Sequence, residues 1–325
     1  MNAFEWVDAH SLDEAVALLS TGTDSVVAKA GGVDLIDLMK EGLVKPTRIV
    51  NLRTIDGLND VRIEANGEVR LGALVTLAQI ASHPHVTKTY GALSAAAHHA
   101  ATPQVRNVAT LGGNLLQRPR CWYFRNERFE RDAVAAAARA GENQYHAIFD
   151  TDRTALVHAS TPATALVAYD ATVHLQSVRG VRTIPLHEFL LPPDPVRASD
   201  TAIGPGEVLS HITIPPLPTG TLSSYHKQTE RDSYDWPICD IAVALQLQPE
   251  RTVVAAKIVL GWVAPTPRRA TEAEQLLIGH ALDEARARDA ARAATQAARP
   301  LARNAYKVAV LEAVIERTLI AVLDK

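Results

Sequence analysis

The 325-residue chain has 47% hydrophobic residues, 21% charged residues and a formal net charge of −3 at pH 7. This composition is typical of a globular protein of two or three domains, and the nearly neutral charge gives no reason to expect nucleic acid as a partner. The sequence lacks an apolar run long enough for a membrane helix and lacks an N-terminal export signal, so we expect a cytoplasmic protein without membrane contact.

The first 56 residues are predicted to form a small β-α-β unit. Ser11 is a helix N-cap with Glu14 three residues later, and strands are expected over 25–28 and 48–52. Gly31 and Gly32 lie between the first strand and a second helix. Such a turn directs free backbone N–H groups and the helix dipole at a bound anion, and we expect this anion to be a phosphate. The candidate cofactor-binding residues here are Lys29, Ala30, Gly31, Gly32, Val33, Asp34 and Leu35.

Asp34 has a simpler interpretation as well. An aspartate in the first turn of a helix commonly caps that helix, and we favour this role over a ligand contact. The loop is neither a G-x-G-x-x-G fingerprint nor a nucleotide-triphosphate loop, so those two classes of site have no motif here.

A second glycine pair lies in the stretch 106–115, after a predicted hairpin over 61–71 and two predicted helices. Its candidate cofactor-binding residues are Ala109, Thr110, Gly112, Gly113 and Asn114. Alone, this stretch is explained equally well by an ordinary tight turn. Together, the two loops suit a diphosphate held from two sides. We therefore expect Gly112→Val or Gly32→Val to abolish cofactor binding and leave the fold largely intact.

These two loops, AGGVDL and RNVATLGGNL, resemble those of the FAD-binding subunit of the molybdenum hydroxylases, which include xanthine dehydrogenase, carbon monoxide dehydrogenase and aldehyde oxidoreductase. The resemblance covers nearly the whole chain. It implies an α+β protein: a two-subdomain FAD-binding fold of the PCMH/VAO type, then a C-terminal α+β domain with a small antiparallel sheet and helices. The expected domains are 1–56, 57–219 and 220–325, with the last boundary in the proline-rich stretch 215–220.

Residues 118–150 resemble an insertion found in one branch of the family, where four cysteines hold an additional iron-sulfur cluster. A [4Fe-4S] cluster normally needs four thiolates, and this segment contains only Cys121, so we expect no iron-sulfur cluster in the chain. A helix is predicted over 127–139. Trp122, Tyr123 and Phe124 are expected to pack on the flavin domain or on a partner subunit.

Thr161 occupies a position where relatives often carry an aspartate that helps hold the flavin. Its hydroxyl can make a hydrogen bond but brings no charge, and Ser160 before it also fits a helix cap. In the last domain, Lys227 and Tyr234 are the candidate cofactor-binding residues, because the K-x-x-x-R-x-S-Y stretch of relatives lies near the isoalloxazine ring. An exposed charge cluster is the alternative. Single helices are predicted over 272–297 and 301–322, and Cys239 is read as a buried structural thiol.

The resemblance implies an electron-transfer subunit that binds FAD. Molybdopterin and [2Fe-2S] clusters would lie on a large and a small partner subunit, and a dimer of heterotrimers is one assembly it allows. No catalytic side chain and no metal site are expected in this chain, because the flavin supplies the chemistry. The complex would oxidise an aldehyde, purine or N-heterocycle. The alternatives are a stand-alone flavin oxidoreductase of this fold, a flavin-free scaffold subunit, and export of the folded chain with a signal-bearing partner.

Overall fold

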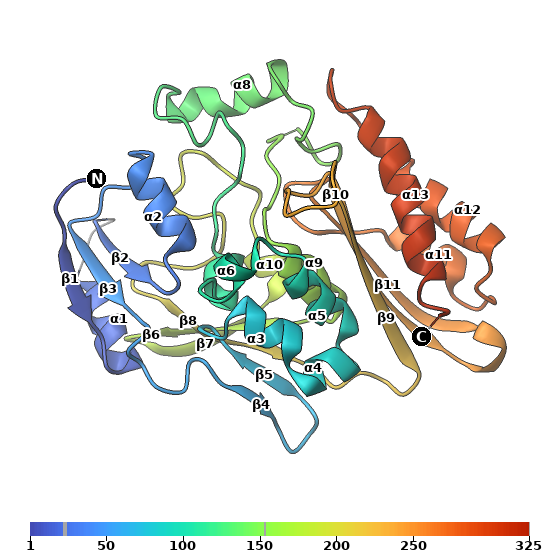
Figure 1. The fold of residues 1–325 in the computed structure, drawn as a ribbon, viewed down its shortest axis with the longest axis horizontal. Coiled ribbons are helices and arrows are strands. Elements are labelled where there is room, and N and C mark those ends of the chain that lie inside the picture. The colour runs from blue at the N-terminus through green and yellow to red at the C-terminus, as the bar shows by residue number, and fades with distance from the viewer. Residues whose placement is uncertain (22–24, 153, 325) are drawn as a thin grey trace.

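Three β-sheets follow one another along the chain and are joined by helices (Figure 1). The computed structural model describes residues 1–21, 25–152 and 154–324. The protein is α+β, as expected. Within these residues, no helix combines the length and the apolar character needed to cross a lipid bilayer.

The N-terminal sheet is parallel and has the strand order β1-β3-β2. Its elements are β1 (Glu5–Asp8), α1 (Leu12–Ser20), β2 (Val26–Lys29), α2 (Val33–Lys40) and β3 (Arg48–Asn51). Strand β1 was not predicted, because its residues are mostly exposed and show no alternation of apolar and polar side chains. The capping of α1 by Ser11 is confirmed, since its Oγ accepts a hydrogen bond from the Glu14 N–H.

The central sheet is antiparallel and has the order β4-β5-β8-β6-β7. Its strands are β4 (Val61–Ile63), β5 (Val69–Gly72), β6 (Thr172–Ser177), β7 (Gly180–Pro185) and β8 (Val208–Ile214). The helices that accompany it are α3 (Leu77–Ser82), α4 (Pro84–Thr89), α5 (Gly91–His98), α6 (Pro103–Arg106), α7 (Leu111–Leu115), α9 (Thr161–Ala168) and α10 (Leu186–Phe189). Every residue of α9 is buried, so this helix lies inside the protein.

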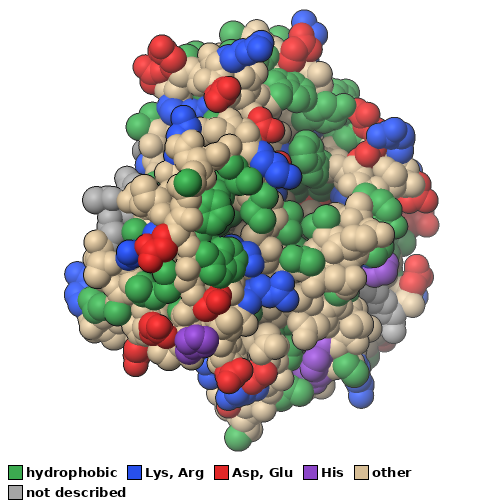
Figure 2. All heavy atoms as spheres, turned by 60° about the vertical axis from the view of Figure 1, so that its left-hand side comes forward, with side chains coloured by type: hydrophobic (Ala, Val, Ile, Leu, Met, Phe, Trp, Pro, Cys, Tyr) green, Lys and Arg blue, Asp and Glu red, His purple; other side chains and the backbone are tan. Residues whose placement is uncertain are grey.

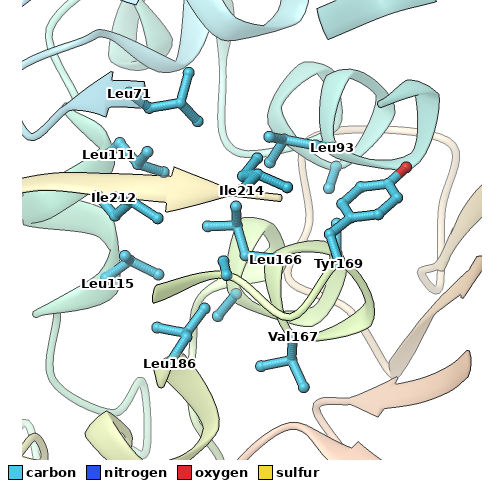
Figure 3. Packing of buried hydrophobic residues seen from close by; sticks show 14 of the residues in the cluster. Leu71, Leu93, Leu111, Leu115, Leu166, Val167, Tyr169, Leu186, Ile212 and Ile214 are labelled. Atoms are coloured by element: carbon cyan, nitrogen blue, oxygen red, sulfur yellow. The ribbon is translucent and has the colours of Figure 1, made fainter. Parts of the chain in front are cut away.

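The short helix α7 is anchored in the core of this sheet. Leu111 and Leu115 are fully buried and point toward the strand residues Leu71 and Ile212 (Figure 3). Burying a leucine side chain contributes about 1.5–3 kcal/mol. The second glycine loop, which includes the start of α7, is therefore held rigidly against the sheet.

The insertion forms an outlying segment whose regular structure is a 3₁₀ turn (Arg131–Ala133) followed by α8 (Val134–Ala140) (Figure 1). The helix predicted over 127–139 thus begins later than expected. Phe124 is 4% exposed and packs in a cluster with Leu38 of α2, as expected for an aromatic residue that contacts the flavin domain. Trp122, in contrast, remains 38% exposed.

The C-terminal sheet is antiparallel with the order β12-β11-β10-β9, and helices cover it. Its elements are β9 (Thr221–Gln228), β10 (Cys239–Leu247), β11 (Val253–Gly261), β12 (Arg268–Arg269), α11 (Thr271–Leu277), α12 (Glu284–Thr295) and α13 (Tyr306–Ile320). The single helix predicted over 272–297 is wrong. Gly279 adopts φ +83 after α11, and Asp283 caps a new helix, so the chain turns between them. Cys239 is fully buried, as predicted.

Candidate functional site

The two glycine loops lie against each other. A Cβ placed on Gly31 would lie 2.2 Å from the carbonyl oxygen of Val108 and 3.3 Å from the Cα of Ala109, so only glycine permits this approach. Gly32 follows with φ +81 and is the N-cap of α2. The structure therefore brings the two glycine loops into contact at Gly31 and Val108, and their sharing of one anion stays a prediction.

Thr110 organises the second loop by capping α7. Its Oγ1 accepts a hydrogen bond from the Gly113 N–H at 3.2 Å. The Gly112 N–H donates to the carbonyl oxygen of Ala73 at 2.8 Å, and a Cβ on Gly112 would lie 3.0 Å from both the Cβ and the oxygen of Ala73. Gly112 is thus packed against the end of β5.

Two expected substitution effects therefore need correction. Gly112→Val would push α7 away from Ala73, and Gly32→Val would put a β-branched residue at φ +81. Both substitutions are therefore expected to lower the stability of the fold as well as to disturb cofactor binding. Cofactor content in these two variants has to be measured beside their stability.

Asp34 does not cap its own helix, so that interpretation is wrong. The N-cap of α2 is Gly32, and no side chain caps this helix. The Oδ2 atom of Asp34 accepts a hydrogen bond from the Arg118 N–H at 2.8 Å, and its Oδ1 atom forms ion pairs with Arg120 at 2.7 Å and Arg125 at 2.6 Å. The first glycine loop is therefore tied to the insertion.

The start of α9 is bonded to the second glycine loop. The Ser160 hydroxyl donates to Asn114 Oδ1 at 2.5 Å and accepts from the Ala163 N–H at 3.0 Å. The neighbouring Thr161 is 4% exposed, and its hydroxyl donates to the carbonyl oxygen of Ala96 at 3.2 Å. Ser160 is thus placed beside the candidate site, whereas the Thr161 side chain is directed into the core.

His158 lies close to the same junction. Its Nδ1 accepts from the Ser160 N–H at 3.3 Å, and its Nε2 is buried with no hydrogen-bond partner among the described residues. Burial lowers the pKa of His158 to about 4, so the imidazole is neutral at pH 7.

A cavity of about 270 Å³ lies between the insertion and the C-terminal sheet. Most of its lining is aromatic or apolar, and charged side chains lie among these residues. The lining residues are Arg120, Cys121, Trp122, Tyr145, His146, Val157, Glu230, Arg231, Asp235, Trp236, Pro237 and Trp262. The Tyr145 hydroxyl donates to the Glu230 carboxylate and so connects the two walls. On the face seen in Figure 2, hydrophobic side chains gather around the middle and upper part, with Lys and Arg side chains among them.

Arg120 connects this cavity to the glycine loops. Besides its ion pair with Asp34, its Nη2 donates to Gln117 Oε1 at 2.7 Å, three residues after Asn114. The Arg120 guanidinium thus contacts Asp34, just after the first glycine loop, and Gln117, just after the second glycine loop, and Arg120 also lines the cavity.

The cavity contains a thiol beside an imidazole. The Cys121 Sγ lies 3.1 Å from His146 Nε2. Burial raises the pKa of the Cys121 thiol to about 11 and lowers the pKa of His146 to about 4, so both groups are neutral at pH 7. In the described parts of the chain, no three His, Cys, Asp or Glu side chains are grouped so that they could hold a metal ion.

The charged stretch of the C-terminal domain is divided between two environments. Arg231 and Asp235 line the cavity and form an ion pair at 2.9 Å. Lys227 instead donates from Nζ to the carbonyl oxygen of His99 at 2.9 Å, and Tyr234 is 58% exposed outside the cavity lining. Of the two residues predicted to bind the cofactor here, neither lines the cavity.

A buried lysine fixes one wall of the cavity. Lys307 of α13 is fully buried, and its Nζ donates to the carbonyl oxygens of Tyr145, His146 and Trp262 at 3.3, 3.0 and 2.7 Å. Burial lowers its pKa to about 7. Sequence reasoning missed Lys307, because it lies in an amphipathic helix pattern where a lysine is expected on the surface.

Comparisons with known proteins match both parts of the chain. The model of the "FAD binding domain in molybdopterin dehydrogenase" matches residues 2–217, and that of the "CO dehydrogenase flavoprotein C-terminal domain" matches residues 224–322. The chain is 34% identical over 285 residues to the aldehyde oxidoreductase FAD-binding subunit PaoB of Escherichia coli K12, covering 85% of this chain and 86% of PaoB. It is 28% identical over 320 residues to the carbon monoxide dehydrogenase medium chain of Hydrogenophaga pseudoflava, covering 97% and 96%.

A solved structure agrees over almost the full length. The carbon monoxide dehydrogenase from Hydrogenophaga pseudoflava, in a form lacking the Mo-pyranopterin moiety, superposes with a TM-score of 0.79 and 27% identity. The match covers 99% of this chain and 98% of that one.

Proposed function

Because the chain belongs to the FAD-binding subunits of the molybdopterin dehydrogenases, we propose that it binds one FAD at the junction of the two glycine loops and the cavity. The diphosphate would lie on residues 29–35 and 109–114, and the isoalloxazine ring would enter the aromatic cavity. The observation that supports this proposal most directly is the contact of Gly31 with Val108, because it brings together two loops that are far apart in the sequence.

The residues present suit the diphosphate and the ring system of such a cofactor. The first turn of α2 has backbone N–H groups without helical acceptors, as at every helix start, and its dipole favours an anion there. A Cβ on Gly113 would meet only the Thr110 hydroxyl, so this glycine leaves room on its other sides. Trp122, Trp236 and Trp262 offer flat apolar surfaces for an aromatic ring system.

FAD supplies the redox chemistry of the site, and the chain's own residues bind and orient it. Thr110, Ser160 and Asn114 fix the second loop through hydrogen bonds. Lys307 and the Tyr145–Glu230 contact hold the cavity walls together and limit the entry of water. Arg120 and Arg231 line the cavity together with Glu230 and Asp235, so the positive and negative side chains of its wall balance each other.

We infer that the chain works in a complex, accepting electrons from a [2Fe-2S] subunit and passing them to an external acceptor. A third, large subunit would contain molybdopterin and the oxidised substrate, consistent with the aldehyde oxidoreductase and carbon monoxide dehydrogenase subunits to which this chain is similar. Exposed Trp122, Tyr234 and Trp236 near the cavity offer apolar contact area for a partner. Cytoplasmic location is part of the same proposal.

The test is the cofactor content of the purified full chain, alone and with copurifying partners. We expect one FAD per chain, with absorption at about 450 nm, and no iron in the chain when it is separated from its partners. Copurification with one molybdenum-containing and one iron-containing subunit supports the assembly. Colourless protein that takes up no FAD, alone or in the complex, refutes the function, and about four irons per separated chain would refute the cluster-free insertion.

A further inference from the structure

The insertion is fastened to the first glycine loop by a cluster of charges. The backbone N–H of Arg118 and the guanidinium groups of Arg120 and Arg125 all contact the Asp34 carboxylate. Arg125 also pairs with Asp37 at 3.0 Å. The side chains of Asp34, Arg120 and Arg125 are only 15%, 16% and 11% exposed, so these interactions are largely shielded from water.

The position of Asp34 creates an electrostatic problem for an anion site. Asp34 is the second residue of α2, and the N-terminus of this helix is where a diphosphate would be bound. Two negative groups a few ångströms apart repel each other, most strongly where water is excluded. A carboxylate at this point opposes diphosphate binding unless nearby cations neutralise it.

The arginines provide this neutralisation. A guanidinium group stays protonated in proteins, even though burial lowers the pKa of Arg120 from its ordinary value. The guanidinium of Arg118 contributes less, because it pairs with Asp200 at 3.3 Å and donates to the carbonyl oxygens of Asp194 and Arg197. Arg120 and Arg125 are the two guanidinium groups in direct contact with the Asp34 carboxylate.

We propose that Arg120 and Arg125 are positioning residues of the FAD site that act through Asp34: they cancel its charge beside the diphosphate and fasten the insertion over the junction of loop and cavity. This inference rests on the proposed function. The insertion, residues 118–150, contains one cysteine, Cys121. The proposed contacts give this segment a role in cofactor binding that requires no metal.

The experiment measures the FAD affinity of the full chain. Bound FAD is first removed, and the FAD-free protein is then titrated with FAD while flavin fluorescence is recorded. Arg120→Gln should weaken FAD binding about tenfold or more, because one cation is lost and Asp34 stays charged. Arg120→Lys should stay within about threefold of wild type because it keeps the charge. In the double variant Arg120→Gln/Asp34→Asn, most of the loss should be recovered, since the repelling carboxylate is gone.

Arg128→Gln is the matched control. Arg128 lies in the same segment and is exposed, so the same change of charge away from Asp34 should leave FAD affinity unchanged. Circular dichroism and thermal unfolding of each variant separate lost affinity from lost fold. A merely structural ion pair would lower and restore the unfolding midpoint in parallel with the affinity, whereas the proposed role predicts that FAD affinity falls and recovers in variants whose midpoints stay close to wild type.

The inference is overturned if Arg120→Gln binds FAD within about threefold of wild type, or if the double variant binds no better than Arg120→Gln. These outcomes require a wild-type chain that binds FAD. A wild-type chain that takes up none would instead refute the proposed function itself, so the two failures are distinguishable.

Discussion

Gly31→Ala is the most direct test of how the two glycine loops meet. The new Cβ would lie 2.2 Å from the Val108 carbonyl oxygen, a separation below the 3.0 Å that real Cβ contacts respect. The Cβ is fixed by the backbone of residue 31, and the carbonyl oxygen belongs to the backbone of Val108, so no side-chain rotation can relieve the clash. The loops must move apart by roughly 1 Å, and such overpacking costs about 1–3 kcal/mol.

The same displacement should weaken FAD binding. A shift of that size takes a backbone N–H out of hydrogen-bond range of a phosphate oxygen. A hydrogen bond to a charged group contributes about 1.5–3 kcal/mol, so we expect the dissociation constant for FAD to rise about 10- to 150-fold. Fluorescence titration of FAD-free protein gives the affinity, and urea unfolding gives the stability.

Gly220→Ala is the control for Gly31→Ala. Gly220 has φ +82, and a Cβ there would lie 2.7 Å from the Leu247 carbonyl oxygen, in the C-terminal sheet. This variant should also lose stability but keep its FAD affinity. If Gly31→Ala loses stability yet binds FAD within about twofold of wild type, the two loops do not jointly hold the diphosphate.

Three further predictions concern buried hydroxyl and carboxyl groups. Ser160→Ala should reduce FAD affinity severalfold because it frees Asn114, whereas Thr161→Ala should cost about 1 kcal/mol of stability and leave FAD affinity unchanged in the same titration. Burial raises the pKa of Asp240 from 3.8 to about 7, so the folded chain keeps a proton that the unfolded chain has released. The stability from this proton is fully present below about pH 4 and is lost as the pH rises through about 7. Asp240→Asn should flatten the urea-unfolding profile over that window, and an unchanged slope would contradict the assignment.

Local patterns predicted much of the fold. The cap at Ser11, the hairpin over 61–71 and the glycine turn before α2 each depend on residues close together in sequence. The resemblance supplied the cofactor and the α+β class. The strand β1 was missed because its residues are mostly exposed and do not alternate between apolar and polar. The break between α11 and α12 was missed because Gly279 and Asp283 interrupt a stretch that otherwise has a helical pattern.

The errors at the site share a physical cause. Asp34 finds its partners 84 and 91 residues later, and the Thr161 hydroxyl finds its acceptor 65 residues earlier. A sequence pattern shows that such groups can form hydrogen bonds but not which partner they reach. Gly112 was likewise recognised as important, although its neighbour Ala73, which follows β5 and lies 39 residues earlier, decides what a side chain there would do.

The contacts of Lys307 set an order on the biogenesis of the protein. The carbonyl oxygens that it holds belong to residues 145, 146 and 262, and Asn304 adds hydrogen bonds to those of His146 and Ala147. These bonds form only after the segment that contains Asn304 and Lys307 has left the ribosome. The glycine loops can thus form before residues 304 and 307 are synthesised, whereas the two walls of the cavity can be joined only afterwards.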